Sequence, residues 1–336
     1  MVTTAGFPRT SRRLMTVAIA LASAVPAWSA PPRVPGPAVT HLVTGLQGAS
    51  GSTIGPGGAL YVTEGATGRI LCVDPQTGQV TVFASGLPPS LIGIGGAIDV
   101  AFLGSTAYAL VTLVGFDVGG SSIVGIYRVD GPTSFTVIAD LGQFSALNPP
   151  STPFDLPTGL QYALDVYRGG FLVTDGHHNR VLHVTLNGEV SEFRTFGNVV
   201  PTGLAIAGNT IYLAEAGPVP HLPQDGKVIA FGPRTDSSTV ASGARLLVDV
   251  ELGRGVSLFA LSQGIFPAGN PAGSPALPNT GALVQVNDAG GLDEVVGGLN
   301  LPTSLEFIGD TAYVVTLAGD ILRIDSVSSP PYGRRP

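Results

Sequence analysis

The 336-residue sequence is poor in cysteine and in charge. Its single cysteine, Cys72, cannot form an internal disulfide, so we expect it to be a buried apolar residue in a protein stabilised by packing. Only 12% of the residues are charged and the net charge is −7, which argues against the basic surface of a nucleic-acid-binding protein. The sequence also lacks a Gly-x-Ser-x-Gly elbow, a Cys-x-x-Cys pair, a phosphate-binding loop and a dinucleotide fingerprint. No complete catalytic motif is therefore recognisable.

Glycine, proline and apolar residues are abundant instead. The chain contains 47 glycines and 28 prolines, and 44% of its residues are apolar. This apolar content indicates a packed core, and the many turn formers favour short strands over long helices. After the N-terminal segment, no extended run has a helical period and no stretch is long and apolar enough for a membrane helix. The composition therefore predicts an all-β protein.

The N-terminus has the three parts of an export signal. Basic residues within 9–13 precede a short apolar run over 14–25. Small residues then follow in the pattern that predicts cleavage between Ser29 and Ala30. We therefore expect a signal peptide over 1–29 and a secreted or periplasmic mature protein. The export route, and whether the segment is cleaved, stay open.

A short phrase recurs six times along the chain. Each copy has a turn, then an apolar run with an aromatic residue, then a polar end, at 58–64, 105–111, 170–175, 209–215, 256–262 and 310–316. From Tyr61 to Tyr313 is 252 residues over five intervals, a mean period of about 50. This period suits four-stranded blades. We predict an all-β fold, a six-bladed β-propeller over 38–327.

The two ends of this repeat region complement each other. The last unit stops after its third strand, at 320–325, whereas 39–46 resembles the fourth strand of other units. This predicts a ring closed by an N-terminal strand that completes the last blade, which removes open sheet edges. A Pro-rich lead over 30–37 and a tail over 328–336 are expected to be loose.

Four long connections are predicted to stand on one face of the propeller. Antiparallel strands place the loop between strands two and three on the same face as the loop between blades. The insertions occur in these two kinds of loop, at 113–122, 144–157, 217–226 and 264–281. Binding residues are concentrated on loops that a rigid scaffold positions. We therefore expect a monomer that recognises a small molecule, a glycan or a protein on this face.

Five acidic residues are candidates for a metal site at the mouth of the central channel. They end second strands or begin innermost strands: Glu64, Asp99, Asp175, Glu215 and Asp249. Carboxylate oxygens suit a hard cation such as Ca²⁺, and the cation would polarise a lactone or ester carbonyl. The alternative is structural, with each carboxylate accepting hydrogen bonds from loop amides or pairing with a neighbouring Arg or Lys.

The most polar stretch of the chain, 175–181, supplies further candidates. Four of its residues are candidates for ligand binding: Asp175, His177, His178 and Asn179. The two histidines are also candidates for a general base. His221, on the insertion of the fourth unit, is expected to approach the same mouth. Adjacent side chains in an extended segment diverge, however, and no second histidine cluster completes a site.

Longer phrases carry a family resemblance that spans nearly the whole mature chain. Those at 51–56, 167–181, 215–223 and 302–309 resemble the ScyD/ScyE-type propeller family, which is associated with scytonemin biosynthesis clusters. The resemblance implies an exported propeller whose biochemical role is not established. Within it, 175–181 resembles the NHL-repeat phrase, which implies structural roles for Asp175 and Arg180. Lactonase-like and strictosidine-synthase-like propellers share only the architecture, which does not transmit activity.

Two functional hypotheses follow. The first is a binding or scaffold protein that recognises a ligand on the face with the inserted loops, and it needs no cofactor. The second is a metal-dependent lactone or ester hydrolase, with carboxylates at the channel mouth as Ca²⁺ ligands and a histidine as base. The sequence does not identify the ligand or the reaction.

Overall fold

The computed structural model describes residues 1–3 and 37–328. The chain divides into two units, Met1–Pro35 and Gly36–Pro336, and all described helices and strands belong to the second. Apart from its first three residues, the predicted signal peptide over 1–29 lies outside the described residues. So do most of the predicted lead over 30–37 and tail over 328–336. No helix within 1–3 and 37–328 is long and apolar enough to cross a membrane.

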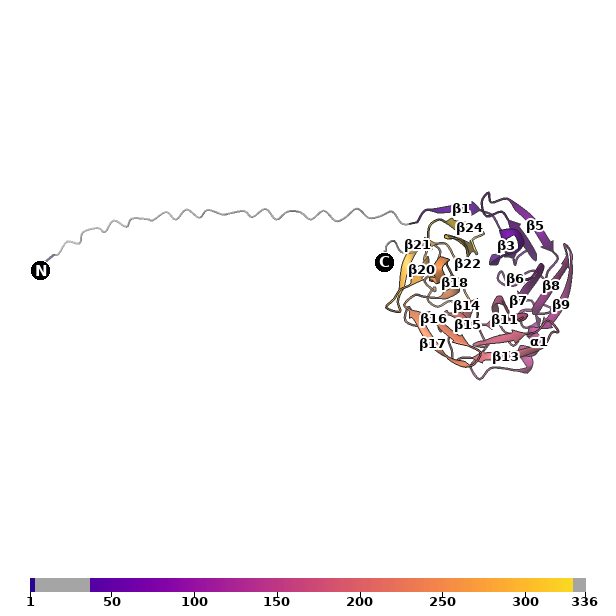
Figure 1. Ribbon diagram of the computed structural model, residues 1–336. Helices are drawn as coiled ribbons and strands as arrows, with labels where there is room; N and C mark the ends of the chain where they lie inside the picture. Colours follow the sequence, from indigo (N-terminus) through magenta and orange to yellow (C-terminus); the bar gives the residue numbers. More distant parts are fainter. Residues whose placement is uncertain (4–36, 329–336) are drawn as a thin grey trace. The chain divides into compact units, whose positions relative to one another are not determined.

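The second unit is a six-bladed β-propeller of four-stranded antiparallel sheets, as predicted (Figure 1). Blade 1 consists of β2 (Ala49–Ile54), β3 (Leu60–Glu64), β4 (Arg69–Val73) and β5 (Val80–Ser85). Blade 2 consists of β6 (Gly96–Leu103), β7 (Thr106–Thr112), β8 (Gly125–Gly131) and β9 (Ser134–Asp140). Blade 3 consists of β10 (Gln161–Tyr167), β11 (Gly170–Asp175), β12 (Arg180–Val184) and β13 (Val190–Thr195).

The second half of the ring repeats this arrangement. Blade 4 consists of β14 (Pro201–Ala207), β15 (Thr210–Glu215), β16 (Lys227–Gly232) and β17 (Thr235–Ser242). Blade 5 consists of β18 (Leu247–Leu252), β19 (Leu258–Ser262), β20 (Gly281–Val286) and β21 (Leu292–Leu299). Blade 6 consists of β22 (Pro302–Ile308), β23 (Thr311–Thr316), β24 (Ile321–Ile324) and β1 (Val39–Val43).

The N-terminal strand closes the ring, which confirms the prediction from the chain ends. β1 pairs antiparallel with β24, with Val39 opposite Ile324 and His41 opposite Leu322. Blade 6 therefore contains segments from both ends of the propeller sequence. This pairing covers the edge that β24 would otherwise present to solvent.

The hydrophobic core lies between neighbouring blades. Second strands are buried along all or most of their length, completely so in β3, β11 and β19, whereas the outermost strands are largely exposed. Aromatic pairs join adjacent blades: Tyr108 and Phe171 have ring centroids 4.7 Å apart, and Phe259 and Phe307 have theirs 4.9 Å apart. Full burial of such a side chain stabilises the fold by roughly 1.5–3 kcal/mol. The recurring aromatic run in the sequence is thus an inter-blade packing element.

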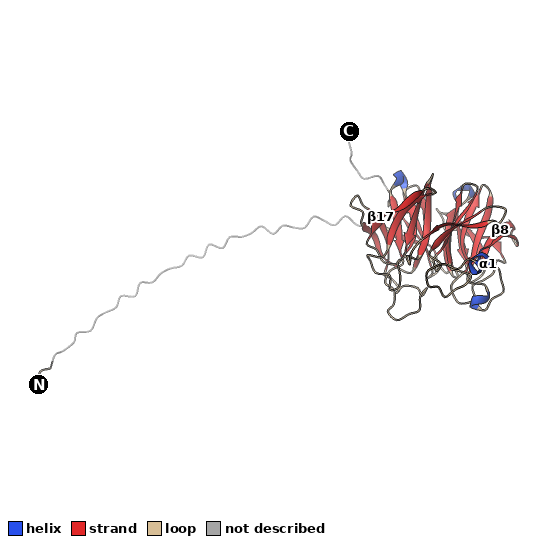
Figure 2. Cartoon of the chain, turned by 90° about the horizontal axis from the view of Figure 1, so that it is seen from below, coloured by secondary structure: helices blue, strands red, loops and turns tan. Residues whose placement is uncertain are grey.

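The long connections gather on one side of the sheets, as the strand directions require (Figure 2). The helix α1 (Leu141–Leu147) follows β9 on this side, and the Asp140 side chain caps it by accepting from the Gln143 backbone N–H at 2.7 Å. The short helix η2 (Phe116–Val118) lies in the connection between β7 and β8. Two other short helices, η1 (Pro56–Gly58) and η3 (Arg254–Val256), join first to second strands and therefore belong to the opposite face.

Candidate functional site

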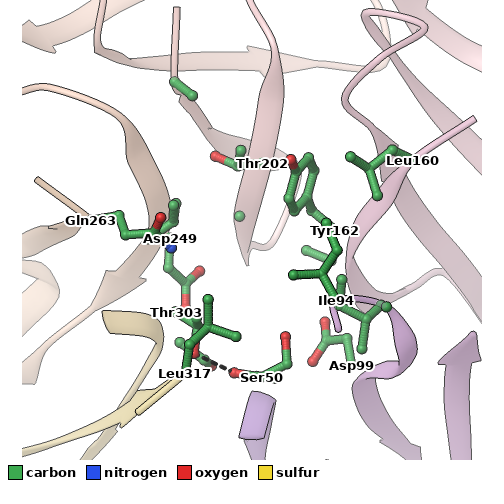
Figure 3. Close-up of a pocket in the computed structure, with 18 of the residues that line it drawn as sticks. Ser50, Ile94, Asp99, Leu160, Tyr162, Thr202, Asp249, Gln263, Thr303 and Leu317 are labelled. Carbon is green, nitrogen blue, oxygen red and sulfur yellow. Dashed lines mark hydrogen bonds between the residues drawn. The ribbon is translucent and has the colours of Figure 1, made fainter. Parts of the chain in front are cut away.

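A cavity of about 320 Å³ occupies the central channel and opens on the face with the inserted loops. All six innermost strands line it, together with residues from three of the four inserted loops. Val219 and His221 come from the loop of blade 4, and 272–275 come from the loop of blade 5. The connection at 144–157 contributes no lining residue. Figure 3 shows side chains from several blades pointing into this space.

Apolar side chains form a collar around the mouth of the cavity. Each member of the collar directly follows a second strand or lies within two residues before an innermost strand: Ile94, Leu113, Leu160, Val200, Leu246 and Leu317. Both positions belong to the inserted-loop face because of the strand directions. Figure 3 shows Ile94, Leu160 and Leu317 at the edge of the cavity. The collar gives a ligand an apolar contact surface around the mouth.

Hydrogen bonds between blades hold the inner wall in place. Thr303 Oγ1 donates to the Ser50 carbonyl at 2.8 Å, which joins blade 6 to blade 1. Thr202 Oγ1 donates to the Leu247 carbonyl, also at 2.8 Å, which joins blade 4 to blade 5. These contacts fasten two of the six junctions between neighbouring blades along the inner wall.

Asp99 and Asp249 are the predicted acids that line the channel (Figure 3). Asp99 accepts from its neighbour Val100 N–H at 2.8 Å and from Leu164 N–H of the next blade at 2.7 Å. Asp249 repeats this arrangement in the opposite half of the ring, accepting from Val250 and Leu305 N–H groups at 2.9 and 2.7 Å. Both residues lie where the register between first and second strands shifts. Each aspartate therefore joins two blades.

Glycines make room for these two aspartates. A Cβ added to Gly51 would overlap Asp99, and one added to Gly203 would overlap Asp249. Each glycine belongs to the innermost strand of the blade before its aspartate. The sequence therefore needs glycine at both positions, because the backbone of one blade passes directly against the carboxylate of the next.

Three further acids line the same channel and were not among the sequence candidates: Asp165, Glu251 and Glu306. Asp165 and Glu251 each accept from the next backbone N–H, at 2.6 Å in both cases. Their location on innermost strands was the available sequence signal. Asp165 and Glu306 directly follow Leu164 and Leu305, the residues whose N–H groups bind Asp99 and Asp249. Among the described residues, neither lysine nor arginine lines the cavity. Within residues 37–328, the channel wall thus contains five carboxyl groups and no permanent cation.

Burial raises the pKa of every acid in this group. It raises the pKa of Asp165 to about 6, that of Asp249 to about 7 and that of Glu251 to about 8, and nearby carboxylates add to the effect on the last two. The pKa values of Asp99 and Glu306 also lie well above their ordinary ranges, chiefly because of burial and secondarily because of the other acids. Backbone N–H groups oppose the shift at Asp99 and Asp249 without cancelling it. A charged group of opposite sign would favour the ionised forms.

The other three predicted metal ligands lie outside the cavity lining. Glu64 accepts from Arg69 Nε at 2.7 Å and from Gln47 N–H at 2.8 Å. Glu215 is paired in register with Lys227, and burial raises its pKa to about 7 although the lysine opposes the shift. Within the described part of the chain, no group of three or more His, Cys, Asp or Glu side chains could hold a metal ion. The structure therefore does not bring the five predicted ligands together.

Asp175 belongs to a buried network that ties α1 to blade 3. Its carboxylate accepts from Arg180 Nε at 3.2 Å and from Leu160 N–H at 3.1 Å. The Arg180 side chain is fully buried and also contacts Ser145 of α1 and Glu192 of β13. The hydrogen bonds of Asp175 and Arg180 agree with the structural roles that the NHL-like phrase implied.

His178 and Asn179 are also held by the fold. His178 Nε2 lies 2.9 Å from the Leu156 carbonyl, and its Nδ1 lies 2.9 Å from Arg180 Nη2. Asn179 has a positive φ of 53°, and its Oδ1 accepts from the N–H groups of Val199 and Val200 at 2.9 Å each. These side chains have their polar atoms engaged within the protein, and neither residue lines the cavity.

His177 and His221, in contrast, both line the cavity. Burial lowers the pKa of each ring, so both imidazoles are neutral near pH 7 and can accept a hydrogen bond or a proton. His221 Nδ1 lies 3.2 Å from the Ala216 carbonyl, and its ring contacts Phe266 edge-on with centroids 5.2 Å apart. Of the three predicted histidines, two therefore reach the cavity and one belongs to the scaffold.

Comparisons with known proteins support the fold. No family model and no curated protein matches the sequence. Among solved structures, the chain is similar to the PQQ-bound aldose sugar dehydrogenase of Streptomyces coelicolor, with 16% identity over 88% of this chain and 99% of that one and a TM-score of 0.58. It is also similar to XC5397, a gluconolactonase from Xanthomonas campestris, with 13% identity over 85% and 89% of the two chains and a TM-score of 0.59.

A third similar structure is virginiamycin B lyase from Staphylococcus aureus, with 12% identity over 86% of this chain and 98% of that one and a TM-score of 0.52. The three proteins have different activities. At these identities the similarity shows a shared six-bladed propeller architecture and does not transfer chemistry. The finer resemblance to the ScyD/ScyE-type family is not tested by these similarities and stays a prediction.

Proposed function

We propose that this protein binds a small organic molecule in the cavity of its central channel, on the face with the inserted loops. The observation that carries the proposal is the composition of the cavity wall, which takes residues from all six innermost strands and from three inserted loops. A volume of about 320 Å³ suits a small molecule, and concave, partly apolar cavities with a few polar groups are the usual form of such sites. A glycan or protein partner would contact the loops more than the channel.

Blocking the mouth tests this proposal. Ala272 is exposed and lines the cavity, so Ala272→Trp places an indole at the mouth without disturbing the core. Leu147→Trp is the matched control, because Leu147 is 73% exposed on α1 of the same face and lies outside the cavity lining. A thermal-shift screen of a small-molecule library should find ligands that stabilise the wild type and Leu147→Trp but not Ala272→Trp. If every ligand found stabilises all three proteins equally, the cavity is not the binding site.

The alternative function is a metal-dependent lactone or ester hydrolase. It is supported by the similarity of the fold to a gluconolactonase, and by the neutral His177 and His221 in the same cavity as Asp99 and Asp249. The geometry favours it less than binding, because Glu64 and Asp175 are used in ion pairs with arginines. Calorimetric titration with Ca²⁺ and a chelator-sensitive lactonase assay would establish it. Asp99→Asn should abolish both signals if this alternative is correct.

We also propose that the protein is exported and belongs to the ScyD/ScyE-type family. Support for export comes from the sequence of the first 29 residues, and support for the family comes from the four matching phrases. Fractionation of cells that express the full chain tests export: a shortened protein outside the cytoplasm supports it, and a full-length cytoplasmic product contradicts it.

A further inference from the structure

The cavity has an uneven distribution of charge along its depth. The collar residues lie next to the ends of the strands at the inserted-loop face. Asp99 and Asp249 lie further along their innermost strands, and Asp165, Glu251 and Glu306 lie further still along theirs. A molecule that enters from the loops therefore meets apolar side chains first and carboxyl groups last.

These carboxyl groups have no cationic partner in the part of the protein that the structure describes. Among residues 37–328, none of the five forms an ion pair with lysine, arginine or histidine. Backbone N–H groups donate two hydrogen bonds to Asp99 and two to Asp249, and the Ser304 side chain also hydrogen-bonds with Asp249. A carboxylate accepts up to about four hydrogen bonds, so both aspartates, which line the cavity, keep acceptor capacity for a ligand. Once a bound cation favours ionisation of these groups, their negative field is concentrated in the low-dielectric channel.

Building on the proposed function, we propose that the ligand is an organic cation: an apolar or aromatic body seated against the collar, with a protonated amine directed toward Asp99 and Asp249. The apolar collar accounts for the body and the unpaired carboxyl groups account for the ammonium group. An anionic ligand would meet five acids and, in the described part of the chain, no compensating lysine or arginine. With a neutral ligand the acids would keep their protons, whereas an ammonium group beside Asp99 and Asp249 would favour the ionised forms.

Sets of matched compounds test this inference on the full-length protein. Each set contains an arylalkylamine, the alcohol of the same skeleton and the carboxylate of similar length, for example phenethylamine, 2-phenylethanol and 3-phenylpropanoate. Calorimetry at pH 7.5 should show the amine binding at least about tenfold more tightly than its alcohol, since a charge-assisted hydrogen bond is roughly twice as strong as a neutral one. The carboxylate should not bind measurably. Ala272→Trp should abolish binding of the amine.

Variants of the two aspartates locate the ammonium group. Asp99→Asn and Asp249→Asn should each weaken binding of the amine about tenfold and leave the alcohol unchanged, and the exposed Asp288→Asn should change neither. If these variants do not fold, the wild-type comparison of amine with alcohol decides alone. A panel in which no amine binds better than its alcohol overturns the inference. In that case the proposed function would still stand if the library contains other ligands whose binding Ala272→Trp blocks. If the library contains no such ligand, both the organic-cation inference and the proposed function fail.

Discussion

Replacing Asp249 by Asn should change how stability depends on pH. The folded protein keeps a proton on this carboxyl up to a pKa of about 7, whereas the unfolded chain releases it near the ordinary value of 3.8. Between these values the folded state binds more protons than the unfolded state. The free energy of unfolding therefore falls as the pH rises through this window. Asn cannot titrate, so the variant loses this contribution.

The magnitude follows from the two pKa values. Their difference corresponds to ~4 kcal/mol above pH 7 if Asp249 titrates alone. Solvent in the channel screens the charge, and we expect about 2 kcal/mol of the wild-type decline between pH 5 and 9 to disappear in the variant. The substitution also acts through Glu251 and Glu306. The charge of Asp249 raises the pKa of both glutamates, so removing it lowers those two pKa values as well. At pH 5 the variant should be less stable by about 1 kcal/mol, since its amide cannot accept from both Val250 and Leu305 N–H groups.

Urea unfolding followed by far-UV circular dichroism measures both effects. The wild type, Asp249→Asn and the exposed control Asp288→Asn are compared at pH 5, 6, 7, 8 and 9. The control should decline with pH as steeply as the wild type, and Asp249→Asn should decline less. A wild-type stability that is constant or rises over this range would refute the reasoning, as would equal slopes in all three proteins.

Three further changes test the scaffold in the same urea assay. Arg180→Met should cost about 3–5 kcal/mol because it leaves a buried carboxylate without its partner, whereas Arg323→Met, in a half-exposed pair, should cost less than about 1 kcal/mol. Gly203→Ala should cost about 2–3 kcal/mol because its Cβ overlaps the backbone of the next blade, and Gly197→Ala, which meets nothing within 4 Å, should be neutral. Deleting β1 should lower the unfolding midpoint and cause aggregation detectable by light scattering, because the edge of β24 is then uncovered. Equal effects within either matched pair, or a soluble, stable deletion variant, would contradict these expectations.

The fold could be predicted because each blade repeats the same local chemistry. An aromatic apolar run recurs with a mean period of about 50 residues, and its members pack between blades as Tyr108 and Phe171 do. The closing strand was also recognisable, because 39–46 resembles other fourth strands. Both signals are local in the sequence, so no knowledge of the tertiary arrangement was needed.

The site was less predictable because it depends on where side chains point in three dimensions. Asp99 and Asp249 were predicted from their places near the start of innermost strands, whereas Asp165, Glu251 and Glu306, further along such strands, were not recognised as channel residues. The ion pairs of Glu64 and Asp175 match the structural alternative considered from the sequence, since an arginine follows each acid by five residues, on the facing strand of the hairpin. Glu215 lacks that spacing because an inserted loop separates it from Lys227.

The seam between β1 and β24 has a consequence for how the protein reaches its native state. Thr40 and Arg323 hydrogen-bond across the seam although 283 residues separate them in the chain. Contacts between such distant residues slow folding, because the entropy of closing a long loop must be lost before the contact forms. The final strand pair can form only once almost the whole propeller sequence is available. Until then the partly made ring has two unprotected edges, and the interval between synthesis and closure is when the chain is most vulnerable to proteases and to association with other chains.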